Sequence, residues 1–323
     1  MFVIGCHRSG TALLYDSLLS AGGFPLYRYA PYVHSTLLSI CGNPSVPRNR
    51  EKLVQLWLRS EPFRRTGFDT EDVRPRLLEE CKSGGDFLRI TMGELARRAG
   101  VERWVVHDCD NIMHMPTIKR EIPDALFIHL VRDGRDAALS LNKQHPVPPR
   151  LWPRKRALFA WALLWQWTVR KGRRCGQSFP ADYIEIHYEE LVRQPEKTLT
   201  TLAEFLDHDL DYGRIQKNAI GRVLSPNTVW KEESGNSFSP IGRWKTKLSE
   251  PEMVALEALI GDCLDEFGYA RTMEHGRGAR LDPAFNFMCV FYPRLFDTKL
   301  FLQSKTLVGR LSRGARLELT DPV

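Results

Sequence analysis

The sequence lacks the features that mark a disulfide-bonded, metal-binding or membrane-spanning protein. Its seven cysteines are scattered, and no two of them form a C-x-x-C pair, so we expect neither a disulfide framework nor a metal site. No apolar run is long enough to cross a bilayer, and no basic flank precedes the short apolar stretch at the N-terminus. These absences predict a cytoplasmic protein with reduced thiols.

A strong excess of charge of either sign is also missing. The 46 basic and 39 acidic residues give a net charge of +7, which favours anionic ligands but is too small to predict nucleic acid as a partner. With 43% hydrophobic residues, the 323-residue chain can bury a sizeable core. The composition therefore favours anionic ligands, with a solvated basic surface as the alternative.

Short apolar runs alternate with helical stretches along most of the chain. Apolar residues recur at helical spacing from Thr11 to the Gly22-Gly23 pair and again over 196–206. The predicted strands are 2–4, 103–109, 125–131 and 183–188. Strands that alternate with helices indicate a parallel sheet. The predicted fold class is α/β, with a P-loop-like parallel β-sheet flanked by helices on both faces.

A glycine loop, "GCHRSGT", follows the first predicted strand directly. Gly5 and Gly10 permit backbone angles that let amide groups approach an oxyanion, and the helix from Thr11 points free N–H groups at the same place. Arg8 adds a charge, while Ser9 and Thr11 add hydroxyl donors. The lysine of a triphosphate-binding P-loop is missing, so the loop predicts a site for a smaller anion without magnesium. An ordinary strand-to-helix turn is the alternative.

A second strand-to-helix turn, "LVRDGRDAALSL", repeats this arrangement. Arg132 stands at the carboxyl end of the third predicted strand, and Ser140 follows eight positions later in the next helix. Ligands of open parallel sheets bind outside the carboxyl ends of the strands, so the two loops can hold two anionic groups of one ligand. The alternative is a solvated cluster of ion pairs among Arg132, Asp133, Arg135 and Asp136.

Together, the two loops resemble those of the sulfotransferase superfamily, whose members use 3'-phosphoadenosine 5'-phosphosulfate (PAPS) as the sulfuryl donor. "GCHRSGTALL" is similar to the family's 5'-phosphosulfate loop, and "LVRDGRDAALSL" is similar to its 3'-phosphate motif. Three further stretches fit in the same order, "PDALFIHLVRD", "YEELVRQPEKTLTTLAEFL" and "IGRWKTKLS". The resemblance implies a sulfotransferase-like domain over 1–270, and it leaves 271–323 as a C-terminal extension.

The resemblance also implies which residues bind the donor. Those expected at the 5'-phosphosulfate are His7, Arg8, Ser9, Gly10, Thr11 and Ala12. Arg132 and Ser140 would hold the 3'-phosphate, and Tyr188 would lie near the adenine. Late contacts would come from Gly242, Arg243 and Trp244, with a core role as the alternative for Trp244. Adenosine 3',5'-bisphosphate would be the product, and no metal would be needed.

The general base is the role that the resemblance leaves open. Many bacterial-type members have Glu-Lys-Thr-Pro at the end of the second strand, whereas this chain has "VHDC" there, with Val106 in place of the glutamate. An imidazole titrates near neutral pH, so we rank His107 first, Asp108 second and His7 third. A hydrogen-bonded strand-end histidine is the alternative for His107. Arg8 is expected to stabilise the charge that develops during in-line transfer.

The expected activity is transfer of a sulfuryl group from PAPS to a hydroxyl, or less readily an amine, of a small-molecule, glycan or lipid-like acceptor. A P-loop small-molecule kinase is one alternative, and the missing lysine argues against it. A catalytically silent nucleotide-binding protein is another, and Val106 supports it. By elimination, the acceptor would lie among residues 24–75, 143–156 and 224–240, which are rich in aromatic side chains.

The last part of the chain lies beyond the resemblance. Residues 282–319 are dense in Phe, Leu and Met, and the basic residues that follow without an intervening acid are Lys305, Arg310, Arg313 and Arg316. Such a stretch can lie in a membrane interface, which would suit a lipid-like acceptor. Pro293 and Asp297 interrupt a clean amphipathic face. We therefore expect a tail packed on the catalytic domain or on a second copy in a homodimer, with peripheral membrane contact as the alternative.

Overall fold

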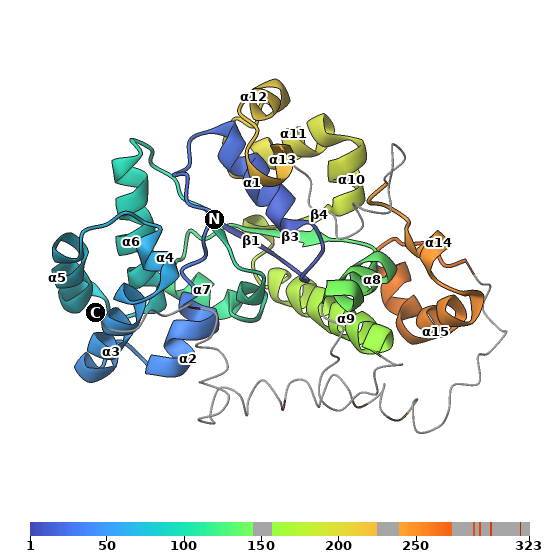
Figure 1. Cartoon of the computed structure of the whole chain (residues 1–323), viewed down its shortest axis with the longest axis horizontal. Helices are drawn as coiled ribbons and strands as arrows, with labels where there is room; N and C mark the ends of the chain where they lie inside the picture. Colours follow the sequence, from blue (N-terminus) through green and yellow to red (C-terminus); the bar gives the residue numbers. More distant parts are fainter. Residues whose placement is uncertain are drawn as a thin grey trace.

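The computed structural model describes residues 1–144, 157–224 and 239–272, and the isolated positions 287, 291, 298 and 317. Within these residues, four strands form one sheet in the order β2-β1-β3-β4, and every neighbouring pair is parallel. The strands are β1 (Phe2–Gly5), β2 (Val106–His107), β3 (Phe127–Val131) and β4 (Tyr183–His187). Helices lie on both faces of this sheet (Figure 1). The predicted α/β class is therefore confirmed.

The helices fill the intervals between the strands. Before β2 come α1 (Thr11–Ala21), the π-helix η1 (Val33–Leu37), α2 (Leu38–Cys41), α3 (Pro47–Leu58), α4 (Glu61–Arg64), α5 (Thr70–Glu80) and α6 (Gly84–Arg98). Between β2 and β4 come the 3-10 helix η2 (Cys109–Met113), α7 (Met115–Glu121), α8 (Gly134–Gln144), α9 (Ala157–Gly176) and the 3-10 helix η4 (Pro180–Asp182). After β4 come α10 (Tyr188–Arg193), α11 (Pro195–Leu206), α12 (Tyr212–Lys217), α13 (Gly221–Leu224), α14 (Trp244–Lys247) and α15 (Glu250–Glu266).

The alternation of side chains along the strands divides the core between two faces. Phe2 and Ile4 of β1 join a cluster that includes buried residues of α3, α5 and α6, whereas Val3 packs with α1 and α11. Figure 1 shows α1 and α10 to α13 on one side of the sheet and α9 on the other, with α2 to α6 gathered at one end. This packing holds the carboxyl ends of β1 and β3 side by side.

The second strand is shorter than the sequence predicted. Instead of residues 103–109, only Val106 and His107 pair with β1. Asp108 ends the strand because its side chain accepts a hydrogen bond from the amide of Asp110 and so caps η2. This early end turns the chain beside the start of α1, where the candidate site lies.

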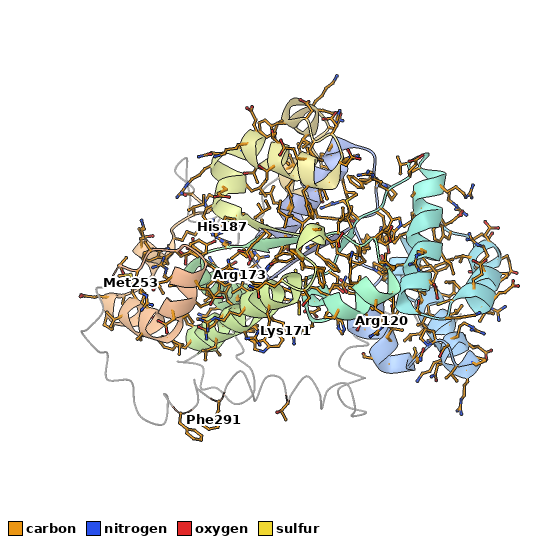
Figure 2. All side chains as sticks on the ribbon, turned by 180° about the vertical axis from the view of Figure 1, so that it is seen from behind. Arg120, Lys171, Arg173, His187, Met253 and Phe291 are labelled. Atoms are coloured by element: carbon orange, nitrogen blue, oxygen red, sulfur yellow. The ribbon has the colours of Figure 1, made fainter. Side chains whose placement is uncertain are left out.

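A partly buried ionic contact joins β4 to α9 and to the end of α15. Seen from behind, Arg173 of α9 lies near His187 at the end of β4 (Figure 2). Nε of Arg173 donates to Glu185 of β4 at 3.2 Å, and Nη1 donates to the carbonyl of Glu266 at 2.7 Å. The guanidinium also stacks on Phe267 at 3.5 Å. These contacts join α9, β4 and the end of α15 into one support for the sheet.

Little of the predicted C-terminal extension is among the described residues. Leu317 is fully buried in the same cluster as Phe2, whereas Phe287 is exposed. Apart from Phe291 and Thr298, the other residues of 273–323, the basic stretch included, lie outside the described part, so the packed tail and the boundary at 270 stay predictions. Two of the segments predicted as acceptor walls are 143–156 and 224–240, and their residues 145–156 and 225–238 lie outside the described part as well. Across the described residues, no helix is both long and apolar enough to cross a membrane.

Candidate active site

Loop one, residues 5–11, is a tight turn between β1 and α1 with a strained backbone. Gly10 has φ 93°, and a Cβ atom added there would lie 2.3 Å from the ring of Tyr188. A Cβ atom on Gly5 would lie 2.5 Å from the carbonyl oxygen of Leu130. Arg8 has φ 70°, a conformation that side-chain-bearing residues rarely adopt. Strain of this kind persists where the surrounding structure holds it, often at functional sites.

Loop one presents hydrogen-bond donors that have no partner among the described residues. The side chain of Ser9 is fully buried, and its Oγ makes no hydrogen bond. The amides of Thr11 and Ala12 lie in the first turn of α1, where no helical carbonyl can accept them, and Gly10 provides no side-chain cap. A buried hydroxyl without a partner costs free energy. An oxyanion at this helix start would satisfy these donors together.

Loop two, residues 132–134 with the start of α8, meets loop one directly. Nε of Arg8 donates to Oγ of Ser140 at 3.1 Å, and Nη1 of Arg132 donates to the carbonyl oxygen of Arg8 at 2.9 Å. The Arg132 guanidinium lies 4.7 Å above the ring of Tyr188, which packs against Gly10. The structure thus brings together five residues that the sequence singled out from three separate stretches.

The charges at this junction favour an anion. Burial and the like charges of Arg132 and Arg222 lower the pKa of Arg8, although an arginine keeps its proton at neutral pH. Arg132 is buried, and its Nε has no hydrogen-bond partner within the described residues. An anion between these guanidinium groups would relieve their mutual repulsion and use the spare donor.

The four charged side chains of loop two are buried and do not form the solvated cluster considered as an alternative; they are Arg132, Asp133, Arg135 and Asp136. Arg135 is neutralised by two carboxylates. Its Nη2 donates to Asp133 at 2.8 Å, and its Nη1 donates to Glu257 at 2.6 Å. Its guanidinium lies 3.7 Å over the ring of Trp244. These partners give Arg135 a structural role next to the candidate site.

Asp136 attaches the late segment, residues 239–244, to loop two. Its carboxylate accepts hydrogen bonds from the amides of Gly242 at 2.7 Å and Trp244 at 3.0 Å. Nη2 of Arg132 donates to the carbonyl of Pro240 at 2.6 Å and lies 4.0 Å from Asp136. The late segment is therefore held next to Arg132 by its backbone.

The backbone of the late segment binds Asp136, whereas its side chains have other partners. The indole of Trp244 is buried in a hydrophobic cluster with α8, α9 and α15, which agrees with the core role considered as the alternative. Nε of Arg243 donates to the carbonyl of Ser239 at 2.9 Å. Gly242 has no side chain, so its predicted contact with the ligand can come only from its backbone. Trp244, with its indole in the core, supports the segment.

His107 meets loop one at the end of β2. Its Nε2 lies 3.0 Å from Oγ1 of Thr11, and its ring stacks on Tyr15 with centroids 5.2 Å apart. Val106, at the position of the family's glutamate, is buried in the core. The imidazole of His107 therefore lies next to the start of α1.

Asp108 follows His107 directly in the sequence, but its carboxylate accepts hydrogen bonds from Ser35 and Asp110. Its Oδ2 accepts a hydrogen bond from Ser35 of η1 at 2.6 Å, and its Oδ1 accepts one from the amide of Asp110 at 3.1 Å. Burial, together with the charge of Asp110, raises the pKa of Asp108 to about 6. These hydrogen bonds make Asp108 the cap of η2.

His7, the third candidate base, projects from loop one toward η2. Its Nε2 lies 3.1 Å from Oδ1 of Asp110, and half of its side chain is exposed. Cys109, the residue before Asp110, lies beside loop one, with Sγ 3.4 Å from Oγ1 of Thr11. The start of η2 therefore belongs to the candidate site along with the two loops.

The sequence profile of the sulfotransferase family matches residues 1–212, more than half of the chain. This match covers both loops, β2 and Tyr188. The chain belongs to the sulfotransferase family. The resemblance inferred from the two loops is thereby confirmed.

Curated relatives of this chain match a shorter stretch. A Caenorhabditis briggsae protein described as a protein-tyrosine sulfotransferase is 29% identical over 94 residues, which cover 29% of this chain and 32% of the relative. A Caenorhabditis elegans protein of the same description is 29% identical over 94 residues, which cover 29% of this chain and 35% of the relative. The match thus spans about a third of the length of these relatives.

Two solved sulfotransferase domains share the fold. The domain from the olefin synthase of Synechococcus PCC 7002 superposes with a TM-score of 0.54 at 18% identity, covering 83% of this chain and 94% of that domain. The domain from the curacin biosynthetic pathway gives a TM-score of 0.54 at 16% identity, covering 83% and 97%. At these identities the likeness concerns the fold alone.

Sequence reasoning missed Asp136 and Cys109. In the sequence Asp136 is only one member of a predicted surface cluster, four positions after Arg132 and just inside α8. Cys109 was treated as one of several scattered thiols. No sequence signal places Cys109 next to Thr11, because the contact joins positions 98 apart in the chain.

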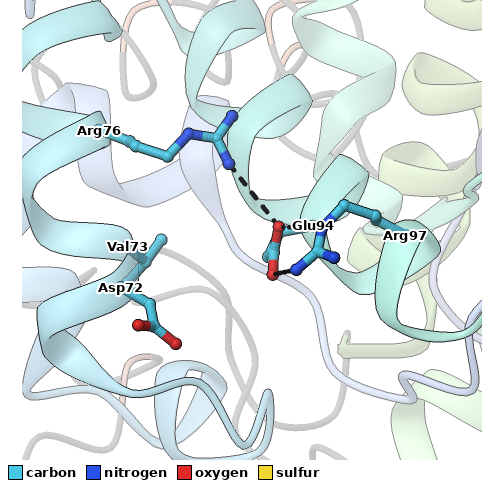
Figure 3. A pocket seen from close by; sticks show the side chains of 5 residues that line it. All are labelled: Asp72, Val73, Arg76, Glu94 and Arg97. Carbon is cyan, nitrogen blue, oxygen red and sulfur yellow. Dashed lines mark hydrogen bonds and ion pairs between the residues drawn. The ribbon is translucent and has the colours of Figure 1, made fainter.

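A hollow on the surface lies away from these loops, between α5 and α6 (Figure 3). The residues that line it are Asp72, Val73, Arg76, Glu94 and Arg97. Its charges pair with one another, since Arg76 lies 3.7 Å and Arg97 2.6 Å from Glu94, and nothing links it to loop one or loop two. Among the residues that the structure describes, no group of three or more His, Cys, Asp or Glu side chains is suited to a metal ion.

Proposed function

We propose that this sulfotransferase transfers the sulfuryl group of PAPS to an acceptor hydroxyl and releases adenosine 3',5'-bisphosphate. The observation that carries the proposal is the hydrogen bond from Arg8 to Ser140, which joins two strand-to-helix loops that each offer a spare buried donor, Ser9 Oγ and Arg132 Nε. Two adjacent anion sites match a ligand with separate 5'- and 3'-anionic groups better than a single triphosphate.

The two loops would divide the donor between them. The start of α1, with Ser9 and Thr11, would hold the 5'-phosphosulfate, because an anion is stabilised at a helix N-terminus. Arg132 and Ser140 would hold the 3'-phosphate, and Tyr188 would lie beside the nucleoside. Arg8 stands between both loops, so it would contact whichever anion gains charge during the reaction.

The reaction would be an in-line displacement at sulfur. The acceptor oxygen attacks the sulfur and forms the new S–O bond while the bond from sulfur to the bridging oxygen breaks, and the electron pair leaves with the 5'-phosphate. His107 would accept the proton of the acceptor hydroxyl, since its Nε2 lies at the start of α1. Arg8 and the amides of loop one would stabilise the charge on the leaving phosphate.

The acceptor itself is proposed only by class. A hydroxyl of a small molecule, a glycan or a lipid-like molecule fits the proposed chemistry, with an amine as the less favoured choice. The description of the curated relatives adds the tyrosine hydroxyl of a peptide to the acceptors worth testing. A packed C-terminal tail, a homodimer and peripheral membrane contact remain proposals for the part of the chain beyond 272.

Calorimetry and turnover measurements test this proposal. Adenosine 3',5'-bisphosphate should bind the full chain without magnesium and raise its melting temperature, whereas magnesium–ATP should not. With PAPS and a panel of hydroxyl acceptors, His107→Ala should lower turnover at least about a hundredfold, the usual scale for a general base, while bisphosphate affinity stays near that of the wild type.

A matched control for the base is Asp108→Ala. If this change abolishes turnover and His107→Ala does not, then the aspartate is the base and the assignment to His107 is wrong. Stabilisation by magnesium–ATP alone would overturn the PAPS proposal and favour a kinase.

A further inference from the structure

We propose that Cys109 is a reactive thiol of the active site, open to soft electrophiles and peroxides, and that its modification stops sulfuryl transfer. The reactivity rests on the cluster around the thiol alone. The loss of transfer rests, in addition, on the function proposed for loop one.

The thiol stands where three elements meet. Sγ of Cys109, at the start of η2, lies 3.4 Å from Oγ1 of Thr11 at the start of α1 and 4.0 Å from Nε2 of His107 at the end of β2. The neighbouring residue Asp110 binds His7 of loop one. A cysteine with the imidazole of His107 beside it, and a second histidine held nearby by Asp110, has the arrangement of an activated nucleophile with its base.

The charges of this cluster favour the thiolate. Burial alone would raise the pKa of Cys109, but the charge of His7 and the hydrogen bond and charge of His107 outweigh it and hold this pKa well below its usual value. In return, the charge of Cys109 and the hydrogen bond to Asp110 raise the pKa of His7 well above its usual value. Thiolate and imidazolium thus stabilise each other, and the thiolate is the form that reacts.

The other described cysteines provide the contrast. Burial raises the pKa of each of them, namely Cys6, Cys41, Cys81, Cys175 and Cys263. Cys175 is the more accessible residue by exposure, while Cys109 is 8% exposed. Exposure alone therefore ranks Cys175 first for modification, whereas the charged cluster ranks Cys109 first.

The chemistry needs only a named electrophile. With iodoacetamide, the thiolate attacks the methylene carbon, an S–C bond forms and iodide leaves. With hydrogen peroxide, it attacks one oxygen, an S–O bond forms, the O–O bond breaks and hydroxide leaves, giving the sulfenic acid. Either product adds atoms beside Thr11 and His107, where the donor's sulfuryl group and the acceptor hydroxyl are proposed to meet.

The test is timed alkylation of the folded full chain. Limiting iodoacetamide at pH 7, with digestion and mass spectrometry, should label Cys109 at least about tenfold faster than Cys175, because the thiolate fraction sets the rate. His7→Gln, which removes one imidazole of the cluster, should slow labelling of Cys109 severalfold and leave Cys175 unchanged. Labelling of Cys175 as fast as or faster than Cys109 in the wild-type protein would overturn the proposal.

Two further arms separate this proposal from the donor assignment. In the first arm, adenosine 3',5'-bisphosphate should slow the alkylation of Cys109 and not that of Cys175. In the second arm, the alkylated wild-type protein should lose sulfuryl transfer, and the Cys109→Ser and Cys175→Ser variants, treated with the same reagent, serve as controls. Fast labelling of Cys109 without protection by the nucleotide would retain the reactive thiol and refute the donor site at loop one. If alkylated Cys109 left transfer intact, the inhibitory role would be wrong.

Discussion

Arg132 and Arg135 stand three positions apart in one turn, and both are buried, yet they have different kinds of partners. Arg135 donates to the carboxylates of Asp133 and Glu257 and stacks on Trp244. Arg132 donates to two backbone carbonyls, keeps Nε spare and has its closest carboxylate at 4.0 Å. The charge of Arg135 is satisfied within the fold, whereas that of Arg132 remains available to a ligand.

The difference shows that burial by itself does not separate a structural arginine from a binding one. A buried charge is tolerated when a counter-charge with good hydrogen-bond geometry accompanies it. Carbonyl oxygens supply hydrogen bonds but only partial charge, so a site built on Arg132 gains from an incoming anion. The kind of acceptor around each guanidinium therefore predicts which substitution harms stability and which harms binding.

The largest effect is expected for Arg135→Ala. This change leaves Asp133 and Glu257 as buried carboxylates without their cation, which typically costs about 3–5 kcal/mol. Urea unfolding should show this loss of stability. Arg135→Lys keeps the positive charge without the forked guanidinium and should recover part of the lost stability. Wild-type stability in the alanine variant would show that the cluster is not structural.

A smaller and more selective effect is expected for Arg132→Ala. Loss of a charged hydrogen bond is worth about 1.5–3 kcal/mol, so affinity for adenosine 3',5'-bisphosphate should fall roughly tenfold or more, while affinity for adenosine 5'-phosphate changes little. Calorimetry with both nucleotides measures the difference. Equal losses for the two ligands would refute the assignment of Arg132 to the 3'-phosphate.

Asp108 extends the comparison to a buried carboxylate that accepts hydrogen bonds from Ser35 and from the backbone amide of Asp110, and neither donor is an arginine. Its pKa, raised from 3.8 to about 6, means that the native state binds this proton more tightly than the unfolded state. The contribution of Asp108 to stability should therefore fall as pH rises from about 4 to 6.

Asp108→Asn should abolish that contribution. The difference in unfolding free energy between variant and wild type should change with pH by up to about 1.4 kcal/mol per pH unit in this window. Unfolding in urea at several pH values from 4 to 7 measures it, and the other titrating groups largely cancel in the difference. A difference that does not vary with pH would contradict the raised pKa.

The smallest effect is expected for Asp136→Asn. The carboxamide can still accept one of the two amides of the late segment, so about 1 kcal/mol should be lost from a single hydrogen bond. Because the segment rests on Arg132 through Pro240, bisphosphate affinity should fall about fivefold with little change in melting temperature. The bisphosphate affinity of Asp136→Ala, whose side chain accepts a hydrogen bond from neither amide, should fall further. If neither variant weakens binding, the late segment does not support the donor site.

Much of the fold could be predicted from the pattern of apolar residues and glycines along the sequence. The short apolar runs and the glycine loop placed β1, β3, β4 and α1 close to their observed bounds, since strand and helix periodicity are properties of adjacent residues. The length of β2 was overestimated because its end depends on the cap that Asp108 makes. The positions of Arg8, Arg132 and Ser140 were also found from the sequence, although their roles stay predictions.

The sequence by itself determined the family, the α/β class and the two loops, because glycines, charges and apolar spacing are written in consecutive residues. The tertiary structure alone decided that Arg132 keeps a spare donor while Arg135 is neutralised, because Glu257 and Pro240 come from segments more than a hundred positions away. It likewise decided that Cys109 lies beside His107 and Thr11. Charge and reactivity depend on which distant groups share a small, water-poor space, and only the folded chain brings those groups together.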